Sequence, residues 1–255
     1  MSVEHRLLEG YLATLHLPTF VRNYAHFAED ATRTNQTYER FLLALAEHEI
    51  NERDRRRQME RLKAAHLPVV KELADFDFSA LPTLNKQRVL DLARGSYIEQ
   101  VEPVLLVGNP GLGKTHLATA LAVAACRQSR RVRFYNVAAL VGELIAAEDE
   151  HRLPKLMAAA LKHDLIVLDE LGFIPFSATG AQLLFQFCST LYERVTLIIT
   201  TNLKFADWTQ VFGDERLTLA LLDRLTHRAH ILEFVGESYR FRQRTQSAQP
   251  TEVAM

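Results

Sequence analysis

Apolar side chains recur at helical spacing through the first 75 residues of the chain. In the first run they share one face of a helix, at Leu7, Leu8, Tyr11, Leu12 and Leu15, and Pro18 then interrupts the pattern. A longer helix is indicated by the apolar positions Phe41, Leu42, Leu45, Met59 and Leu62. The alternation that is typical of strands does not occur in this part of the sequence. The pattern therefore predicts a small all-helical N-terminal domain over residues 1–75.

A different pattern begins after the turn-forming segment DFDFSALPTLNK. From Val104 onward, short apolar runs alternate with helical patterns, and these runs are VLLVG, RVRFYNV, LIVLDE, TLIITTN and HILEFVG. Uninterrupted apolar runs suit strands that are covered on both faces, and the helices between them indicate parallel crossovers. The expected fold class is α/β, with a parallel sheet and flanking helices over residues 76–242, followed by a disordered tail over 243–255.

The first of these runs leads into a glycine-rich loop of the kind that wraps phosphate groups. Gly108 is followed by four residues and then by Gly113, Lys114 and Thr115, between an expected strand and an expected helix. Backbone N–H groups would surround the β-phosphate, Lys114 would neutralise charge at the β- and γ-phosphates, and the Thr115 hydroxyl would bind Mg²⁺. The expected nucleotide-binding segment is Gly108, Asn109, Pro110, Gly111, Leu112, Gly113, Lys114, Thr115 and His116.

Two adjacent carboxylates end the third apolar run, where an open parallel sheet binds its ligand. Asp169 is expected to hold Mg²⁺ through water, and Glu170 to act as the general base that activates the attacking water. The next apolar run ends in Asn202, whose amide is expected to orient that water. The loop by itself also fits a small-molecule kinase, but the paired acids favour hydrolysis.

The segment from Asp169 to Gly172 also has the D-x-x-G form of a GTPase switch. A GTPase would further need an N-K-x-D sequence to recognise guanine, and the nearest candidate, TNLKFAD, has the wrong spacing. Adenine is therefore the expected base. Arg224 and Arg228 lie one helical turn apart near the end of the core, and Arg224 is expected to complete charge neutralisation at the γ-phosphate, with Arg228 as the alternative. If Arg224 acts on the nucleotide of a neighbouring subunit, the active form is a homo-oligomer.

Composition limits the partners that the chain as a whole could attract. The 255 residues include 48% hydrophobic and 24% charged side chains, and the formal net charge is −1, so any nucleic-acid site must be a local patch. The two cysteines lack C-x-x-C spacing and suit reduced thiols. Charges interrupt the N-terminal apolar run, and no later run reaches membrane-spanning length, so a cytoplasmic protein without a membrane partner is expected.

A local basic patch occurs in NERDRRRQMERLK, residues 51–63, which contains six basic and three acidic side chains. Helical spacing would let Glu49 pair with Arg53 and Glu52 with Arg56, whereas Arg55 and Arg61 have no acidic partner four residues away. A solvated, self-paired helix face is one interpretation. The other is sequence-nonspecific contact with DNA phosphates through Arg53, Arg55, Arg57, Arg61 and Lys63.

Taken in order, these motifs resemble those of an AAA+ ATPase, and more narrowly those of IstB, the ATPase helper of IS21-type transposases. DnaC-like helicase loaders are close relatives of that family. The most specific segments are YERFLLALAEHE, DFDF, GNPGLGKTHLA, LIVLDELGF, LLDRLTHRAHILEF and GESYR. The resemblance covers almost the whole chain.

The resemblance implies Walker A function for Gly108 to Thr115 and Walker B function for Asp169 and Glu170. It further implies a sensor role for Asn202 and a finger acting in trans at Arg224. The segment between the second strand and Asp169 resembles a helical insertion that contacts nucleic acid, which makes Arg152 and Lys155 additional DNA-binding candidates. Only a short tail follows HILEFVGESYRFRQR, so the lid domain is expected to be reduced or absent and no lid arginine is assigned.

By resemblance, ATP binding assembles subunits on duplex DNA, and hydrolysis in contact with a transposase releases or repositions them. The alternative is a loader of a replicative helicase. A metabolic kinase without DNA dependence is a third possibility.

Overall fold

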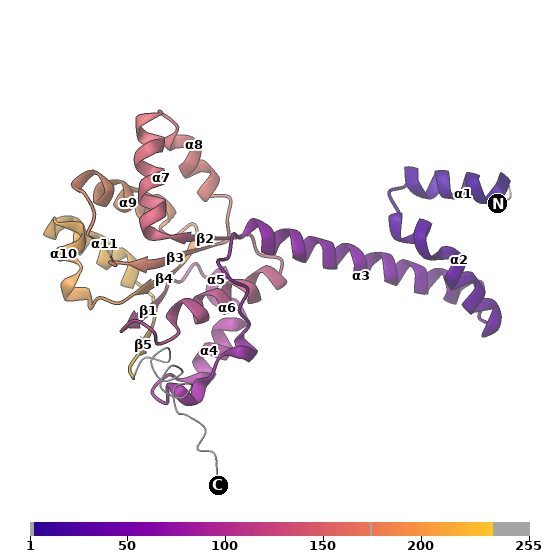
Figure 1. Ribbon diagram of the computed structural model, residues 1–255, viewed down its shortest axis with the longest axis horizontal. Helices are drawn as coiled ribbons and strands as arrows, with labels where there is room; N and C mark the ends of the chain where they lie inside the picture. The colour runs from indigo at the N-terminus through magenta and orange to yellow at the C-terminus, as the bar shows by residue number, and fades with distance from the viewer. Residues whose placement is uncertain (1–2, 174, 237–255) are drawn as a thin grey trace, which may run out of the picture. The chain divides into compact units, whose positions relative to one another are not determined.

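The computed structural model describes residues 3–173 and 175–236. The chain divides into two compact units, and the boundary between them lies between Glu60 and Arg61 (Figure 1). The tail expected over 243–255 and the expected end of the core at residue 242 lie outside the described residues, as does the segment where a lid domain would begin. None of the described helices is both long enough and apolar enough to cross a membrane.

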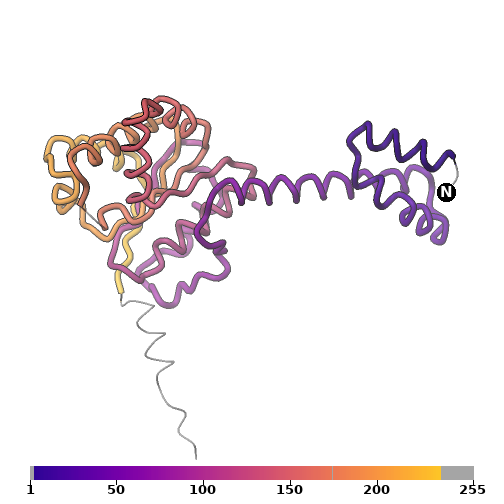
Figure 2. The backbone as a smooth tube through the Cα atoms, turned by 45° about the horizontal axis from the view of Figure 1, so that its top comes forward, coloured from indigo at the N-terminus to yellow at the C-terminus, as the bar shows by residue number. Residues whose placement is uncertain are grey.

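The N-terminal unit is helical, as predicted. Helix α1 spans Val3–Thr14, α2 spans Pro18–Arg33 and α3 spans Tyr38–Ala64, so that the last turn of α3 belongs to the second unit. Proline suits the first position of α2 because that position needs no N–H donor and its backbone angle is already fixed. Both views show α1 and α2 gathered against the first half of α3 (Figures 1 and 2).

A buried carboxylate holds these three helices together. One oxygen of Glu49 accepts the backbone N–H of Thr19 at 2.9 Å, and the other accepts the Nε–H of Arg53 at 2.6 Å. The same guanidinium donates to the backbone carbonyl of His16, in the turn between α1 and α2. Burial acts to raise the pKa of Glu49, but the hydrogen bonds from Arg53 and Thr19 outweigh it and leave the pKa below its usual value.

The second unit is an α/β sandwich around a parallel sheet. The strands are β1 Val104–Gly108, β2 Val132–Asn136, β3 Leu165–Leu171, β4 Thr196–Thr201 and β5 His230–Phe234. They lie in the order β2-β3-β4-β1-β5, and every pairing is parallel. All five apolar runs of the sequence are strands of this sheet, which confirms the predicted α/β class.

Helices cover both faces of the sheet, which explains why the strands are almost entirely apolar (Figure 1). The helices of this unit are α4 Lys86–Ala93, α5 Ser96–Glu99, α6 Lys114–Arg127, α7 Val137–Asp149, α8 Leu153–Ala160, α9 Ala178–Leu191, α10 Thr209–Phe212 and α11 Glu215–Thr226. Short 3-10 turns occur at Leu73–Asp75, Phe78–Ala80 and Phe205–Asp207. One apolar core contains α4, α5 and α6, and the other contains α7, α9, α10 and α11.

The segment from residue 61 to residue 75 packs with the second unit. Ala65 is fully buried in the core on the α6 side, and its carbonyl accepts the N–H of Phe134 from the edge strand β2 at 2.8 Å. Leu62, Leu67 and Leu73 lie against the same core. The division between the units therefore falls earlier along the chain than the boundary expected from the change in composition near residue 75.

We expect Glu49→Gln to destabilise the N-terminal unit by about 1–3 kcal/mol, because the amide keeps one acceptor oxygen and turns an NH2 donor toward the other of the two buried N–H groups. The matched control is Glu52→Gln, which removes a more exposed ion pair of 3.6 Å with Arg55 and should cost under about 1 kcal/mol. Urea unfolding of the full chain, followed by helical circular dichroism, measures both.

Because the pKa of folded Glu49 is lowered, its stabilisation is complete above its ordinary pKa of about 4.3 and is lost as pH falls through the folded value. The difference between wild type and Glu49→Gln should shrink over that acidic range. Equal destabilisation by the two substitutions at neutral pH would contradict the role given to Glu49.

Candidate nucleotide site

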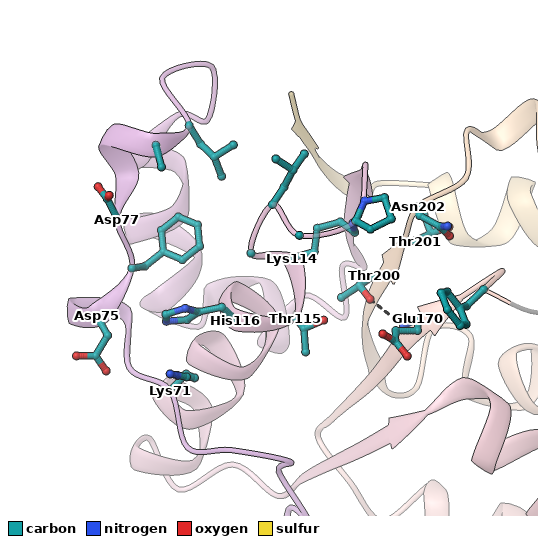
Figure 3. Close-up of a pocket in the computed structure, with 18 residues that line it drawn as sticks. Lys71, Asp75, Asp77, Lys114, Thr115, His116, Glu170, Thr200, Thr201 and Asn202 are labelled. Atoms are coloured by element: carbon teal, nitrogen blue, oxygen red, sulfur yellow. Dashed lines mark hydrogen bonds between the residues drawn. The ribbon is translucent and has the colours of Figure 1, made fainter. Parts of the chain in front are cut away.

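A cavity of about 580 Å³ opens at the carboxyl edge of the sheet, beside the glycine-rich loop (Figure 3). Four segments of the second unit meet around it: the stretch that precedes α4, the loop between β1 and α6, the end of β3 and the end of β4. Side chains from these segments line the cavity and include Lys71, Phe76, Asp77, Lys114, Thr115, His116, Glu170, Thr200, Thr201 and Asn202. The fold therefore brings together, at one cavity, residues that are far apart in the sequence and that are candidates for binding phosphate and a metal ion.

Glycine is required where the loop leaves β1. Gly108 has a φ of 151°, and a Cβ atom on it would lie 2.2 Å from the carbonyl oxygen of Phe234 in β5. Gly113 has a φ of 88° and lies directly before α6, with the Phe76 ring close to the position of its missing Cβ. The loop can therefore turn sharply and direct the first backbone N–H groups of α6 into the cavity, an arrangement suited to an anion.

Lys114 and Thr115 begin α6 with their polar atoms at the loop. The ammonium of Lys114 donates to the carbonyls of Gly108 and Asn109, at 2.6 and 2.8 Å. The hydroxyl of Thr115 donates to Asp169 at 2.9 Å. The positive charge and the hydroxyl that the sequence predicts for this site are thus held at the glycine-rich loop.

Asp169 accepts hydrogen bonds from two hydroxyls and is buried to 5% exposure. Besides Thr115, the hydroxyl of Thr200 on β4 donates to the same oxygen at 2.6 Å. Burial raises the pKa of Asp169 and the charge of Glu170 adds to this, although the two hydroxyls and Lys114 oppose the shift. Thr200 also accepts the backbone N–H of Glu170 at 2.9 Å (Figure 3). One side chain thus contacts both acidic residues.

The backbone of Glu170 is strained. Its φ is 62°, a left-handed conformation that costs a non-glycine residue of the order of 1–3 kcal/mol. The pairing of β3 with β4 shifts register between Leu168 and Leu171, and Glu170 lies within this irregularity of the strand. The side chain then lines the cavity, where Asn136 donates to its carboxylate at 3.0 Å. Strain of this kind persists where surrounding contacts fix it, and here those contacts converge on a candidate general base.

Sequence reasoning missed three parts of this site. Asn136 was not singled out, although it ends a strand next to Asp169 in register and also caps α7. Thr200 was passed over in favour of Asn202, which follows β4 and also lines the cavity. The DFDF segment was expected only to form turns, but the centre of its Phe76 ring lies 5.3 Å from that of His116, and both residues line the cavity. Polar residues at strand ends were the available signal for Asn136 and Thr200.

Arg224 does not line the cavity in the described part of the chain. It lies in the last turn of α11, where its guanidinium donates to the Ser189 hydroxyl and lies 5.1 Å from the centre of the Phe185 ring. Arg228 instead pairs with Glu102 at 3.1 Å. Arg224 is therefore held against α9, outside the cavity.

The DNA-binding candidates are mostly exposed and largely ion-paired. Arg55 pairs with Glu52 at 3.6 Å, and Arg57 with Asp54 at 3.5 Å, so the expected pairing of Glu52 with Arg56 is replaced by contacts three residues apart. Arg53 is committed to Glu49 and to the turn before α2.

The remaining candidates divide between the second unit's N-terminal edge and the α7–α8 insertion. Arg61 is half-buried and Lys63 is exposed at the end of α3. Arg152 pairs with Glu150, whereas Lys155 is exposed on α8. Within the basic patch of residues 51–63, the side chains of Arg53, Arg55 and Arg57 already have acidic partners. Fewer of its positive charges are therefore available to DNA phosphates than the sequence indicates.

The sequence is similar to a family of ATP-binding proteins along most of its length. The model of the family described as IstB-like ATP binding protein matches residues 10–247. The ATP-binding protein of insertion sequence IS21 from Pseudomonas aeruginosa is 37% identical over 237 residues, which cover 93% of this chain and 89% of that protein. An insertion-sequence ATP-binding protein of Sinorhizobium fredii is 40% identical over 242 residues, covering 94% of this chain and 81% of the relative.

Solved structures share the fold at lower identity. The DnaC helicase loader aligns with a TM-score of 0.50 and 23% identity, over 58% of this chain and 87% of that one. AMPPCP-bound DnaA from Aquifex aeolicus aligns with a TM-score of 0.56 and 18% identity, over 74% of this chain and 58% of that one. These likenesses confirm the AAA+ fold of the second unit, and the sequence matches establish that the chain belongs to the IstB-like ATP-binding protein family.

Proposed function

We propose that this protein is a cytoplasmic, Mg²⁺-dependent ATP hydrolase that assembles as a homo-oligomer on duplex DNA and assists a transposase in target selection and integration. The observation that carries the proposal is the cluster of Lys114, Thr115, Asp169 and Glu170 around one cavity, with a phosphate-binding loop on one side and a strained acid on the other. ATP binding is the property by which the family is named.

Glu170 is the group that we assign to proton transfer. Its carboxylate lines the cavity and can accept a proton from a water that attacks the γ-phosphate, while Asn202 at the end of β4 can orient that water. Thr200 fixes the backbone of Glu170, and Asn136 fixes its carboxylate. The chain therefore supplies a base with a defined position, which hydrolysis needs and simple nucleotide storage does not.

The residues at the loop fit Mg²⁺. Thr115 and Asp169 present two hard oxygen atoms 2.9 Å apart, which is the donor type that Mg²⁺ prefers. The described residues contain no cluster of three or more His, Cys, Asp or Glu for a cage made of protein alone, as suits an ion that shares its ligands with phosphates and water. When bound, Mg²⁺ supplies charge neutralisation at the β- and γ-phosphate oxygens.

The proposed binding to DNA and to a transposase is supported by sequence similarity. Several relatives are named as ATP-binding proteins of insertion sequences. The DnaC-like fold keeps helicase loading as the alternative function. Co-purification with the transposase from the same insertion sequence, or instead with a hexameric helicase, distinguishes these two functions. Formation of ADP and inorganic phosphate without a phosphorylated small molecule excludes a metabolic kinase.

Glu170→Gln should bind ATP with near wild-type affinity and hydrolyse it at least roughly 100-fold more slowly, because the amide cannot take the proton of the attacking water. Lys114→Ala should instead weaken ATP binding, since the loop loses its positive charge. Fluorescent-nucleotide titration and phosphate release measure the two effects. Equal hydrolysis rates for wild type and Glu170→Gln would remove Glu170 from the mechanism.

Thr200→Val should lower kcat by roughly 10- to 100-fold with little change in ATP affinity, because it removes hydrogen bonds to Asp169 and to the backbone of Glu170 while keeping the shape of the side chain. Thr200→Ser keeps the hydroxyl and should retain most of the activity. Thr190→Val is the control on α9, where the hydroxyl donates only to a carbonyl of its own helix. A Thr200→Val rate equal to wild type would show that strand contacts alone position Glu170.

Arg224→Ala should spare nucleotide binding and abolish hydrolysis, since an arginine supplied in trans contributes about 10³ to 10⁵ in rate. Mixing Arg224→Ala with Lys114→Ala subunits should partly restore phosphate release, because one mixed interface combines an intact nucleotide site with an intact Arg224. Size-exclusion chromatography establishes that both variants assemble. Absence of rescue between two assembling variants would mean that Arg224 acts in cis or only in packing.

A further inference from the structure

The N-terminal unit contains its own cavity, of about 570 Å³, between α1, α2 and α3. Its lining combines small apolar side chains with three arginines and one acid, and consists of Ala13, His16, Pro18, Val21, Arg22, Glu49, Arg53 and Arg56. We call this the arginine groove. None of the residues that line it belongs to the nucleotide site.

The arginine groove is positive although the unit that contains it is not. Residues 1–60 contain 8 arginines and 10 acidic residues, a net charge of −2 (8 − 10). Arg33, Arg53, Arg55 and Arg57 are ion-paired with acids of the same unit. Arg22 and Arg56 are exposed, and neither has a carboxylate within ion-pair distance in the described residues.

Glu49 does not cancel the charge of the groove for an incoming anion. Its side chain is 4% exposed, and both of its oxygens already accept N–H groups, from Thr19 and Arg53. The acid therefore anchors Arg53 and the turn before α2, while the Nε–H of Arg22 donates to the carbonyl of Pro18 at 3.2 Å. Two guanidinium groups without an acidic partner, those of Arg22 and Arg56, thus border the cavity. The contacts of buried Glu49 with Thr19 and Arg53 fix its walls.

We propose that the arginine groove binds the sugar-phosphate backbone of duplex DNA, with Arg22 and Arg56 contacting phosphates and Ala13, Pro18 and Val21 facing deoxyribose. Guanidinium groups bind phosphate oxygens through directed pairs of N–H groups, and apolar walls suit the sugar that separates successive phosphates. Phosphates and sugars repeat along every duplex, so a contact with the backbone is independent of base sequence. This inference rests on the proposed DNA binding and identifies where it occurs.

The structure supplies a matched control on the same helix. Arg55 and Arg57 flank Arg56 along α3, are exposed and have the same charge, but both are paired with acids three residues earlier. The double variant Arg22→Gln/Arg56→Gln should lose DNA affinity on the order of ten-fold at low salt, as expected for lost charged hydrogen bonds. Arg55→Gln/Arg57→Gln should change affinity by no more than about two- to five-fold, because those side chains already have partners.

The measurement is fluorescence anisotropy of the full-length protein with ATP on two unrelated duplexes over a range of salt concentrations. Each phosphate contact contributes about 0.9 to the slope of log affinity against log salt, so the groove variant should have a smaller slope on both duplexes. Arg22→Lys/Arg56→Lys keeps the charge and should retain most of that slope. Circular dichroism and urea unfolding establish that the helical unit is intact in all variants.

Wild-type binding to DNA with an unchanged groove variant would overturn this inference and leave the proposed function standing. Equal losses in the groove and control variants would also overturn it, because a general charge effect needs no groove. A groove variant that keeps DNA binding but no longer co-elutes with the purified transposase would assign the groove to an acidic protein segment instead. Failure of the wild type to bind either duplex would overturn the proposed function as well.

Discussion

The carboxylate of Asp169 accepts hydroxyl hydrogen bonds from two separate elements, and the geometry of the nucleotide site depends on that contact. Thr115 donates from the start of α6, and Thr200 donates from the end of β4. Neither distance would hold unless β1, β3 and β4 lay parallel and in register, with the loop of β1 beside them. The parallel pairing of these apolar strands thus fixes the distance between the glycine-rich loop and the acidic pair.

Glu170 carries backbone strain that this framework maintains. A register shift after Leu168 places it in a left-handed conformation that the chain would otherwise avoid. Contacts from Thr200 to its backbone and from Asn136 to its carboxylate hold it there. Because Asn136 also caps α7, the orientation of Glu170 is connected to the start of the helical insertion between β2 and β3. The position of Glu170 therefore depends on three strands and one helix terminus.

The helical unit uses a buried charge for a different purpose. Glu49 satisfies a helix N–H and a guanidinium at once, which makes burial of the carboxylate tolerable and ties α3 to the turn between α1 and α2. This contact consumes Arg53, while pairs three residues apart consume Arg55 and Arg57. Among the arginines that line the groove, Arg22 and Arg56 remain available to a ligand, and these two residues lie on different helices.

The sequence alone determined the α/β class, the five strands and the loop that begins α6, because apolar runs and the spacing of glycines before a lysine are local signals. It also identified the acidic pair at the end of β3. It could not determine which polar residues contact that pair, since Thr200 and Asn136 reach it only through strand register.

The same limit applied to charge. Helical spacing correctly indicated the pairing of Arg53 with Glu49. The further bond from Arg53 to the His16 carbonyl, and the position of Arg22 and Arg56 at one groove, depend on how the helices pack. Likewise, the placement of Arg224 against Phe185 and Ser189 follows from the packing of α11 on α9. Local sequence determined the elements and the reactive groups, whereas contacts between residues far apart in the chain decided which of those groups are held and which are available.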